Sequence, residues 1–236
     1  MNERPVWFDG QTPTRKPEPL SLERIVAAAI DLADQQADGE ITMRTLADRL
    51  GVRSPMALYR YVANKDRLAD LMADHGYSHL EVTRGQGWRI ALHRLGTSGW
   101  SAVQRHPWFA RLALRRPPLG PHALAAYDAA LAELDPLDLP AATRMGFVNT
   151  VLGHVLGSGL ALLEEQAMRT RTGLATEQEL ATAAAPYLDR ISAAGEHPFF
   201  IRWANDPDRH AAAPQTFEVI LDWLLDGLAT VADHPA

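Results

Sequence analysis

The stretch "GVRSPMALYRYVANKDRL", residues 51–68, crowds arginine, tyrosine and lysine into an otherwise acidic chain. The 236-residue protein has 23 Lys and Arg against 29 Asp and Glu, which gives a formal net charge of −6. Between residues 41 and 67, however, six cations face only Asp48 and Asp66, a local balance of +4. A basic segment in an acidic protein indicates a local anionic partner rather than a general affinity for nucleic acid.

Short helices are predicted on both sides of the glycine that opens this stretch. Thr42 is a good N-cap for a helix that places Leu46 and Leu50 four residues apart and ends at Gly51. Residues 54–55, a serine and a proline, are suited to the start of the next helix. Two short helices joined by a glycine-bearing turn form a helix-turn-helix, whose second helix enters the major groove of DNA.

The second of these helices, residues 55–63, has two different sides at 3.6 residues per turn. One side is expected to pack on the preceding helix and holds Leu58, Tyr61 and Val62. The other side is expected to face DNA and holds Met56, Tyr59, Arg60 and Ala63. An exposed Arg-Tyr face is also common on an ordinary solvated helix, so spacing alone leaves both interpretations open.

The remainder of the chain is predicted to be helical, because period-2 alternation with β-branched residues is almost absent. Residues 1–20 are rich in proline and predict an irregular arm, in which Arg15 and Lys16 either touch a neighbouring groove or belong to a disordered leader. The first helix is expected to begin after Ser21 and to end at Gly39, and a longer helix to open at Asn64. Further helices are expected over residues 87–104, 107–114, 121–134, 140–168, 176–194, 197–205 and 214–232.

Composition excludes several classes of protein. Without cysteine there is no disulfide framework and no thiolate zinc site, which is consistent with a cytoplasmic location. We expect no uncharged apolar run of 18 or more residues and therefore no membrane span. The segment "MNERPVWFDG" is not expected to be a secretory signal. Phosphate-binding glycine loops and the GxSxG and HExxH motifs are absent, so an enzyme is not expected. The histidines are scattered without metal-ligand spacing, and neither a metal nor a cofactor is expected.

The segment "ITMRTLADRLGVRSPMALYRYVANKDRLADLM" resembles the DNA-binding domain of the TetR family of bacterial transcriptional regulators, over roughly residues 20 to 80. "RHPW", "RRPPLGPHAL", "VLGHVLGSGL" and "FEVILDWLLDGLATV" are similar, more loosely, to the effector domain of the tetracycline-repressor branch. The resemblance implies a flexible arm (1–20), a three-helix helix-turn-helix domain (21–80, with the start of a connecting helix at 64–80) and a helical effector-binding and dimerisation domain (81–236). The implied protein is an all-α, homodimeric repressor that a small molecule releases from a double-stranded DNA operator.

Residues for DNA contact follow from the same resemblance. Tyr59 and Lys65 correspond to phosphate contacts, and Thr42 and Arg44 lie where phosphate or a base is within reach. Base-edge or backbone contacts correspond to Pro55, Met56, Ala57, Arg60 and Tyr61. The gap from Gly51 to Leu58 is one residue longer than the family pattern, so the correspondence is drawn from the "LYRYV" side and the register before Ala57 stays open.

The larger part should contain a ligand cavity with apolar walls and a few polar groups. Candidate lining residues are Trp100, His106, Trp108, Arg111, Arg116, Tyr127, Asn149 and His154. Each has an alternative role as a satisfied core or surface residue. The magnesium-dependent recognition of tetracycline repressors does not transfer, because the relevant positions hold no matching residues.

Gly153 and Gly157 lie four residues apart and permit close approach of another helix. Together with "FEVILDWLLDGLATV" they predict the four-helix dimer interface that the resemblance implies, intramolecular packing being the alternative. A DNA-binding activator, or a regulator whose second domain binds a protein, also remains open.

Overall fold

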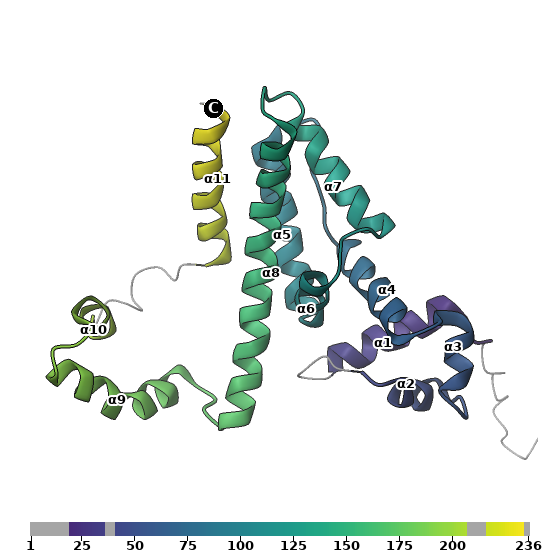
Figure 1. The fold of residues 1–236 in the computed structure, drawn as a ribbon, viewed down its shortest axis with the longest axis horizontal. Coiled ribbons are helices and arrows are strands. Elements are labelled where there is room, and N and C mark those ends of the chain that lie inside the picture. Colours follow the sequence, from purple (N-terminus) through teal and green to yellow (C-terminus); the bar gives the residue numbers. More distant parts are fainter. Residues whose placement is uncertain (1–18, 36–40, 207–215, 234–236) are drawn as a thin grey trace, which may run out of the picture.

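A computed structural model describes residues 19–35, 41–206 and 216–233, and all its regular elements in these ranges are helices, α1 to α11 (Figure 1). The predicted all-α fold is confirmed. The predictions for Arg15, Lys16 and Gly39, and for a last helix that begins at 214, fall on residues outside the described ranges.

Four short helices form the N-terminal part: α1 (Leu22–Gln35), α2 (Met43–Leu50), α3 (Met56–Val62) and α4 (Lys65–Tyr77). Ser21 starts α1 as expected, since its Oγ accepts a hydrogen bond from the Arg24 amide at 3.2 Å. Ile25, Leu58 and Leu68, from α1, α3 and α4, are 0–1% exposed and belong to one shared core. This core fixes the angle between α2 and α3, because both helices bury their apolar sides in it.

The larger part is a bundle around one long helix, α8, which stands in the middle of Figure 1. Its helices are α5 (Trp88–Arg105), α6 (Trp108–Arg115), α7 (Pro121–Leu134), α8 (Ala141–Thr172), α9 (Glu177–Ala193), α10 (Pro198–Ala204) and α11 (Phe217–Asp233). Helix α8 packs on α5, α6, α7 and α11. Glycines allow the close contacts: a Cβ on Gly159 would lie 2.8 Å from Val103 Cβ.

Helix α8 corrects one sequence expectation. It is long and apolar enough to cross a membrane by length and composition, and residues 145–163 carry no Asp, Glu, Lys or Arg. The expectation that the chain holds no uncharged apolar run of this length is therefore wrong. In the structure this helix is the centre of the bundle, and 44% of its most apolar window is buried there. A core helix that is apolar on most sides meets the same criterion as a membrane span.

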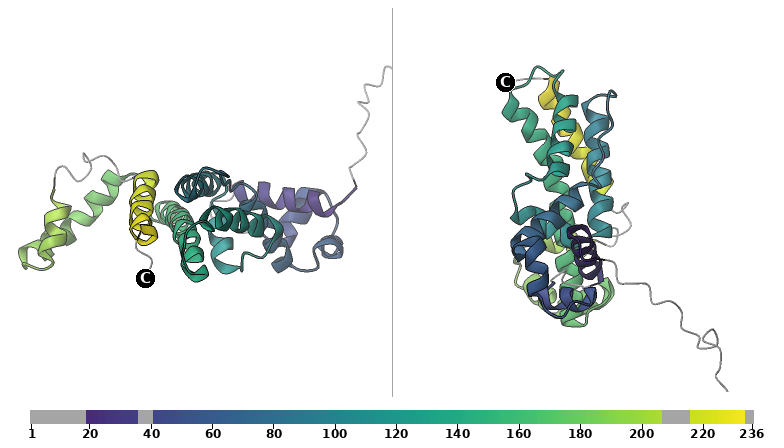
Figure 2. Two further views of the ribbon diagram at one scale, coloured as in Figure 1. Left: turned by 90° about the horizontal axis from the view of Figure 1, so that it is seen from above. Right: turned by 90° about the vertical axis from the view of Figure 1, so that its right-hand side faces the viewer.

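Helices α9 and α10 extend away from the bundle (Figures 1 and 2). Their main helix contact is with each other. Their aromatic side chains are largely exposed, at 79% for Phe199, 58% for Trp203 and 56% for Tyr187. Exposed aromatic residues are therefore concentrated on these two helices.

Candidate nucleic-acid interface and effector cavity

Side-chain caps set the bounds of α2 and α4. Thr42 Oγ1 accepts a hydrogen bond from the Thr45 amide at 3.1 Å, and the Thr42 amide donates to Thr45 Oγ1 at 3.2 Å. Gly51 ends α2 with φ of 68°, the left-handed conformation that glycine adopts without strain. Asn64 Oδ1 accepts from the Arg67 amide at 2.7 Å and starts α4. The caps predicted at Thr42, Gly51 and Asn64 are therefore confirmed.

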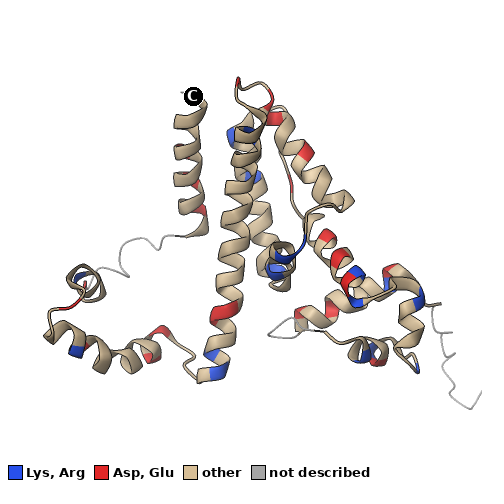
Figure 3. Cartoon of the chain, viewed as in Figure 1, with Lys and Arg blue, Asp and Glu red and all other residues tan. Residues whose placement is uncertain are grey.

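The predicted DNA-contact residues lie together, on the start of α2, on α3 and on the first residue of α4. Figure 3 shows Lys and Arg on these same helices. Arg44, Arg60 and Lys65 are exposed, and none of them forms an ion pair with a residue that the structure describes. Other arginines are neutralised, for example Arg89 by Asp226 at 2.7 Å and Arg111 by Glu164 at 2.7 Å. The cations of the helix-turn-helix are thus available to an external anion.

The face of α3 differs from the prediction in its two tyrosines. Leu58 and Val62 are fully buried, as expected, and Met56 is 69% exposed. Tyr61, expected on the packed side, is 38% exposed, whereas Tyr59, expected on the reading side, is partly buried against the core. Both tyrosines lie about 80° from the Leu58–Val62 midline, on opposite sides. Spacing within α3 therefore cannot predict which of the two tyrosines is buried. Packing against the neighbouring helices determines it.

A tight corner joins α3 to α4. Ala63 has φ of 58° and ψ of −50°, which lies near the strained form of γ-turn with positive φ, and such rarely populated backbone conformations cost about 1–3 kcal/mol. Its amide donates to the Tyr59 carbonyl at 3.1 Å, and the Asn64 amide donates to the Val62 carbonyl at 2.6 Å. The corner lets α4 begin at Lys65, three residues after α3 ends.

Three aspartates of α4, at positions 66, 70 and 74, hold the segment that follows α6. Asp66 and Asp70 both pair with the Arg116 guanidinium, at 2.9 Å for Asp66. Asp74 Oδ1 accepts from the amides of His122 and Ala123, each at 3.0 Å, at the start of α7. Residues four apart lie on one helix face, so α4 presents a continuous acidic edge to this segment. The four-residue spacing of these aspartates is the sequence signal for this edge, and the sequence predictions above did not include it.

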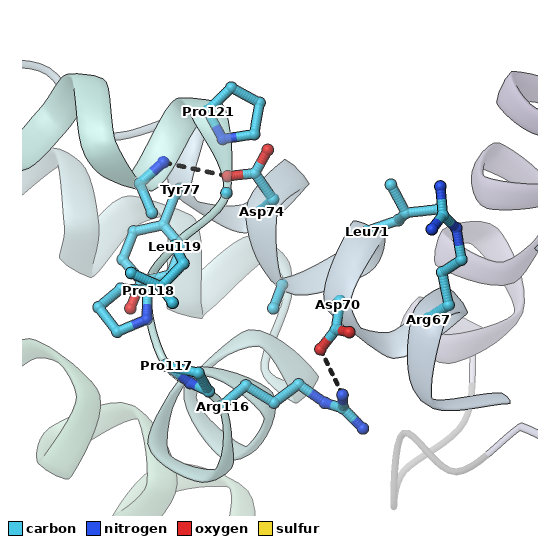
Figure 4. A pocket seen from close by; sticks show the side chains of 13 residues that line it. Arg67, Asp70, Leu71, Asp74, Tyr77, Arg116, Pro117, Pro118, Leu119 and Pro121 are labelled. Atoms are coloured by element: carbon cyan, nitrogen blue, oxygen red, sulfur yellow. Dashed lines mark hydrogen bonds and ion pairs between the residues drawn. The ribbon is translucent and has the colours of Figure 1, made fainter. Parts of the chain in front are cut away.

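A cavity of about 420 Å³ lies between α4 and residues 116–121 (Figure 4). The segment contributes Arg116, three prolines and Leu119, and α4 contributes Leu71 and Tyr77 along with charged side chains. Burial raises the pKa of the Tyr77 hydroxyl, so it stays protonated and can donate a hydrogen bond. Apolar walls with a few polar groups are typical of sites for small organic molecules.

A second cavity of about 280 Å³ lies on the other side of Arg116, between α4 and α6. Of the eight residues predicted for the ligand site, Trp108, Arg111 and Arg116 line it. Arg116 also lines the larger cavity and is therefore shared by the two. Three predicted residues are thus brought together.

The other five predicted ligand residues are not brought to these two cavities. Trp100 and His154 stack on Phe217 with ring-centroid distances of 4.7 and 4.3 Å, and His154 Nε2 lies 3.1 Å from the Phe217 carbonyl. The Tyr127 hydroxyl donates to Asn149 Oδ1 at 3.4 Å, between α7 and α8. These four side chains make packing or hydrogen-bond contacts within the bundle, and their place in a ligand site stays a prediction.

His106, the fifth, faces the N-terminal part. Its Nδ1 lies 2.8 Å from Asp34 Oδ1, and Trp108 Nε1 donates to the same oxygen at 2.6 Å. Asp34 is in α1, so a single carboxylate ties the helix-turn-helix part to α6. His75 and His79 of the α4 end also surround His106, although the sequence analysis treated the histidines as scattered. Their spacing of four residues was the available signal.

Comparison with known proteins gives concordant matches. A family model described as tetracyclin repressor-like, C-terminal domain, matches residues 83–232. The HTH-type transcriptional repressor DrrR1 of Streptomyces coeruleorubidus is 34% identical over 205 residues, 85% of this chain and 75% of that protein. The TetR family protein ActR of Streptomyces coelicolor, solved with actinorhodin and with (S)-DNPA, has a TM-score of 0.70 at 25% identity, over 91% of this chain and 99% of ActR. BioQ, solved with its double-stranded DNA operator, has a TM-score of 0.51 at 27% identity, over 66% of this chain and 94% of BioQ.

Proposed function

Because the chain belongs to the TetR family of ligand-responsive transcriptional regulators, we propose that it is a repressor that binds a pseudo-palindromic operator as a homodimer. A small-molecule inducer in the C-terminal domain releases it. Members of this family are DNA-binding regulators, so the chain is not an enzyme. We place the DNA-binding domain at residues 21–80 and the effector and dimerisation domain at 81–236, with action in the cytoplasm.

The observation that carries this proposal is the connection between the DNA-reading face and the larger cavity through one helix. Lys65 at the start of α4 belongs to the unpaired cations, and Leu71 and Tyr77 farther along α4 line the cavity. A compound that separates α4 from residues 116–121 therefore acts directly on the helix that is attached to the helix-turn-helix, which we call the reading head.

On the DNA, α3 is the recognition helix. Exposed Arg60 and Met56 reach base edges, and Lys65 and Thr42 bind phosphate on either side. Phosphate contacts fix the register and base contacts carry the specificity. Two reading heads of a dimer would occupy half-sites about 34–36 Å apart, one turn of DNA.

Induction follows from the contacts of the 116–123 segment. Asp66 and Asp70 hold it through Arg116, and Asp74 holds it through the start of α7. A ligand that fits only when this segment has shifted would move α4 and change the spacing of the two reading heads. A coupling free energy of about 1–3 kcal/mol is sufficient for such regulation.

A mobility-shift assay with the full-length protein and its own upstream DNA tests this function. The first candidate inducers to test are (S)-DNPA and actinorhodin, the two compounds in the ActR complexes. We expect a shift that weakens with salt and is reversed by one compound. A protein that does not distinguish this DNA from random DNA at any salt concentration is not the proposed repressor.

A pair of tryptophan variants locates the inducer. Leu71→Trp fills the cavity that Leu71 lines, so it should leave operator binding intact and abolish release. Leu114→Trp, on an exposed site of α6, is the matched control and should release normally. Normal release of Leu71→Trp would place the inducer elsewhere.

The homodimer is supported by an uncovered face on α8 and α11. A Cβ built on Gly153 or Gly157 meets no atom within 4 Å, so both glycines border open space in one chain. On α11, Trp223 is 55% and Val219 36% exposed. Small residues beside exposed apolar ones favour close packing of helices from a second copy.

Trp223→Glu tests this face. A buried, unpaired carboxylate at a dimer interface is costly, so we expect the variant to be monomeric at micromolar concentration where the wild type is dimeric. Sedimentation velocity measures the mass. Leu114→Glu changes an equally exposed site on α6 and should remain dimeric. A dimeric Trp223→Glu protein would move the interface away from α11.

An activator that uses the same DNA face is the second candidate. A footprint over the protein's own promoter that lowers transcription in vitro distinguishes repression from activation.

A further inference from the structure

Three histidines meet where the C-terminal ends of α4 and α5 lie close together. His75 and His79 come from the C-terminal end of α4 and the turn after it, and His106 follows α5 directly. Their ring centroids lie 5.0 Å (His75–His79), 5.2 Å (His79–His106) and 6.1 Å (His75–His106) apart. One ring nitrogen from each lies within 4.8 Å of the other two. Side chains 31 positions apart thus present nitrogen donors to one small volume.

One of these nitrogens has no partner within the protein. His79 Nε2 is buried and accepts or donates no hydrogen bond among the described residues. No other buried side-chain nitrogen or oxygen in the described ranges is in this situation. An unsatisfied buried polar atom costs about 1–3 kcal/mol, so its position calls for a ligand.

The environment of His106 directs its second nitrogen to the same place. Asp34 Oδ1 lies 2.8 Å from His106 Nδ1 and also accepts from Trp108 Nε1. A carboxylate at Nδ1 keeps the proton there and leaves a lone pair on Nε2. The side chain of His106 is only 9% exposed, so this tautomer is fixed in a buried site. Such a carboxylate behind a histidine is the usual outer partner of a metal-binding imidazole.

We propose that His75, His79 and His106 bind one divalent cation of the zinc class, with Asp34 as the outer carboxylate that orients His106. Three imidazoles suit zinc, nickel, cobalt or copper, whereas magnesium and calcium prefer oxygen ligands. A tetrahedral zinc ion requires nitrogens about 3.3 Å apart, from metal–nitrogen distances of about 2.0–2.1 Å. The ring nitrogens lie within 4.8 Å of one another, so the half-buried His75 and His79 rings would have to rotate to reach this spacing. Water takes the fourth position.

A metal ion binds the neutral form of histidine, and all three proposed ligands are imidazoles. The ion would join the ends of α4 and α5 directly, and α1 through Asp34. This role is separate from the inducer cavity.

Calorimetric titration of the chelator-treated, tag-free, full-length protein with zinc chloride tests the site. We expect one ion per chain and no binding heat with magnesium chloride. His79→Gln should weaken zinc binding at least tenfold, and His75→Gln should do the same. Asp34→Asn should weaken it about 10–100-fold with the stoichiometry unchanged, because Asp34 is a positioning residue.

His93→Gln is the matched control, because His93 is a half-exposed histidine of α5 that faces Asp222 rather than the cluster. It should bind zinc like the wild type. Circular dichroism of each metal-free variant shows whether it is folded. Two ligand variants are used, so the test still gives an answer if one of them does not fold. Cobalt gives a second readout, since its visible absorption is intense only in tetrahedral coordination. Absence of stoichiometric zinc binding, equal affinity in His79→Gln, His75→Gln and His93→Gln, or equal binding of magnesium overturns the proposal.

Discussion

Gly76→Ala is expected to lower the free energy of unfolding by about 1–3 kcal/mol or more, the usual range for an overpacked core. A Cβ at Gly76 would lie 2.1 Å from Phe109 Cδ2 and 2.5 Å from Phe109 Cγ. The Phe109 ring cannot retreat, because it is fully buried and packs edge-on against Tyr77 at 5.1 Å. Alanine favours a helix over glycine by about 1 kcal/mol, which is too little to offset this collision.

Urea denaturation followed by circular dichroism measures the effect. Gly146→Ala is the control, because Gly146 is also helical and an added Cβ meets no atom within 4 Å. It should be as stable as the wild type or up to about 1 kcal/mol more stable. Equal stability of the two variants would mean that α4 and α6 are farther apart than in this structure. Since Gly76 precedes Tyr77 of the inducer cavity, Gly76→Ala should also disturb induction.

Arg60→Ala is expected to lower operator affinity by about 1–3 kcal/mol, roughly 5-fold to 150-fold, and to leave affinity for random DNA nearly unchanged. Arg60 is exposed on α3 without an ion-pair partner among the described residues, and an arginine can bind guanine through two hydrogen bonds. Lys65→Ala should instead weaken binding to all sequences alike and reduce the salt dependence by about one phosphate contact.

Titrations of operator and random DNA at several salt concentrations distinguish the two effects. Arg94→Ala, an arginine of α5 that pairs with Glu81, controls for the loss of one positive charge and should bind both DNAs normally. Equal losses on operator and random DNA for both Arg60→Ala and Lys65→Ala would contradict the division between base and phosphate contacts.

Local features of the sequence predicted the helices well, because caps act over three or four residues. Thr42, Gly51 and Asn64 each fixed a helix end that the structure reproduces. The two tyrosines of α3 could not be assigned, since they flank the buried stripe symmetrically and only tertiary neighbours distinguish them.

The effector region was harder to predict, because its residues meet over long sequence separations. Arg116 meets Asp66 across 50 positions, and His106 meets Asp34 across 72. Polar residues inside the apolar helix α8 bond other parts of the bundle, His154 to the Phe217 carbonyl and Asn149 to the Tyr127 hydroxyl, so their polarity alone does not identify a cavity. Regular spacing of charged or metal-binding residues along α4 would have been the better signal.

The three aspartates of α4 have a consequence for engineered hybrids of this protein. They span eight positions, about 12 Å of helix, and must all face residues 116–123 at once. One residue inserted between Asp66 and Asp74 would rotate one end by about 100° and break at least one of these attachments. If the reading head is replaced by that of another protein and the junction lies before Asn64, α4 stays intact and its three aspartates keep their relative orientation. Hybrids joined there should retain induction, whereas joints inside α4 should give proteins that bind DNA without responding to the inducer.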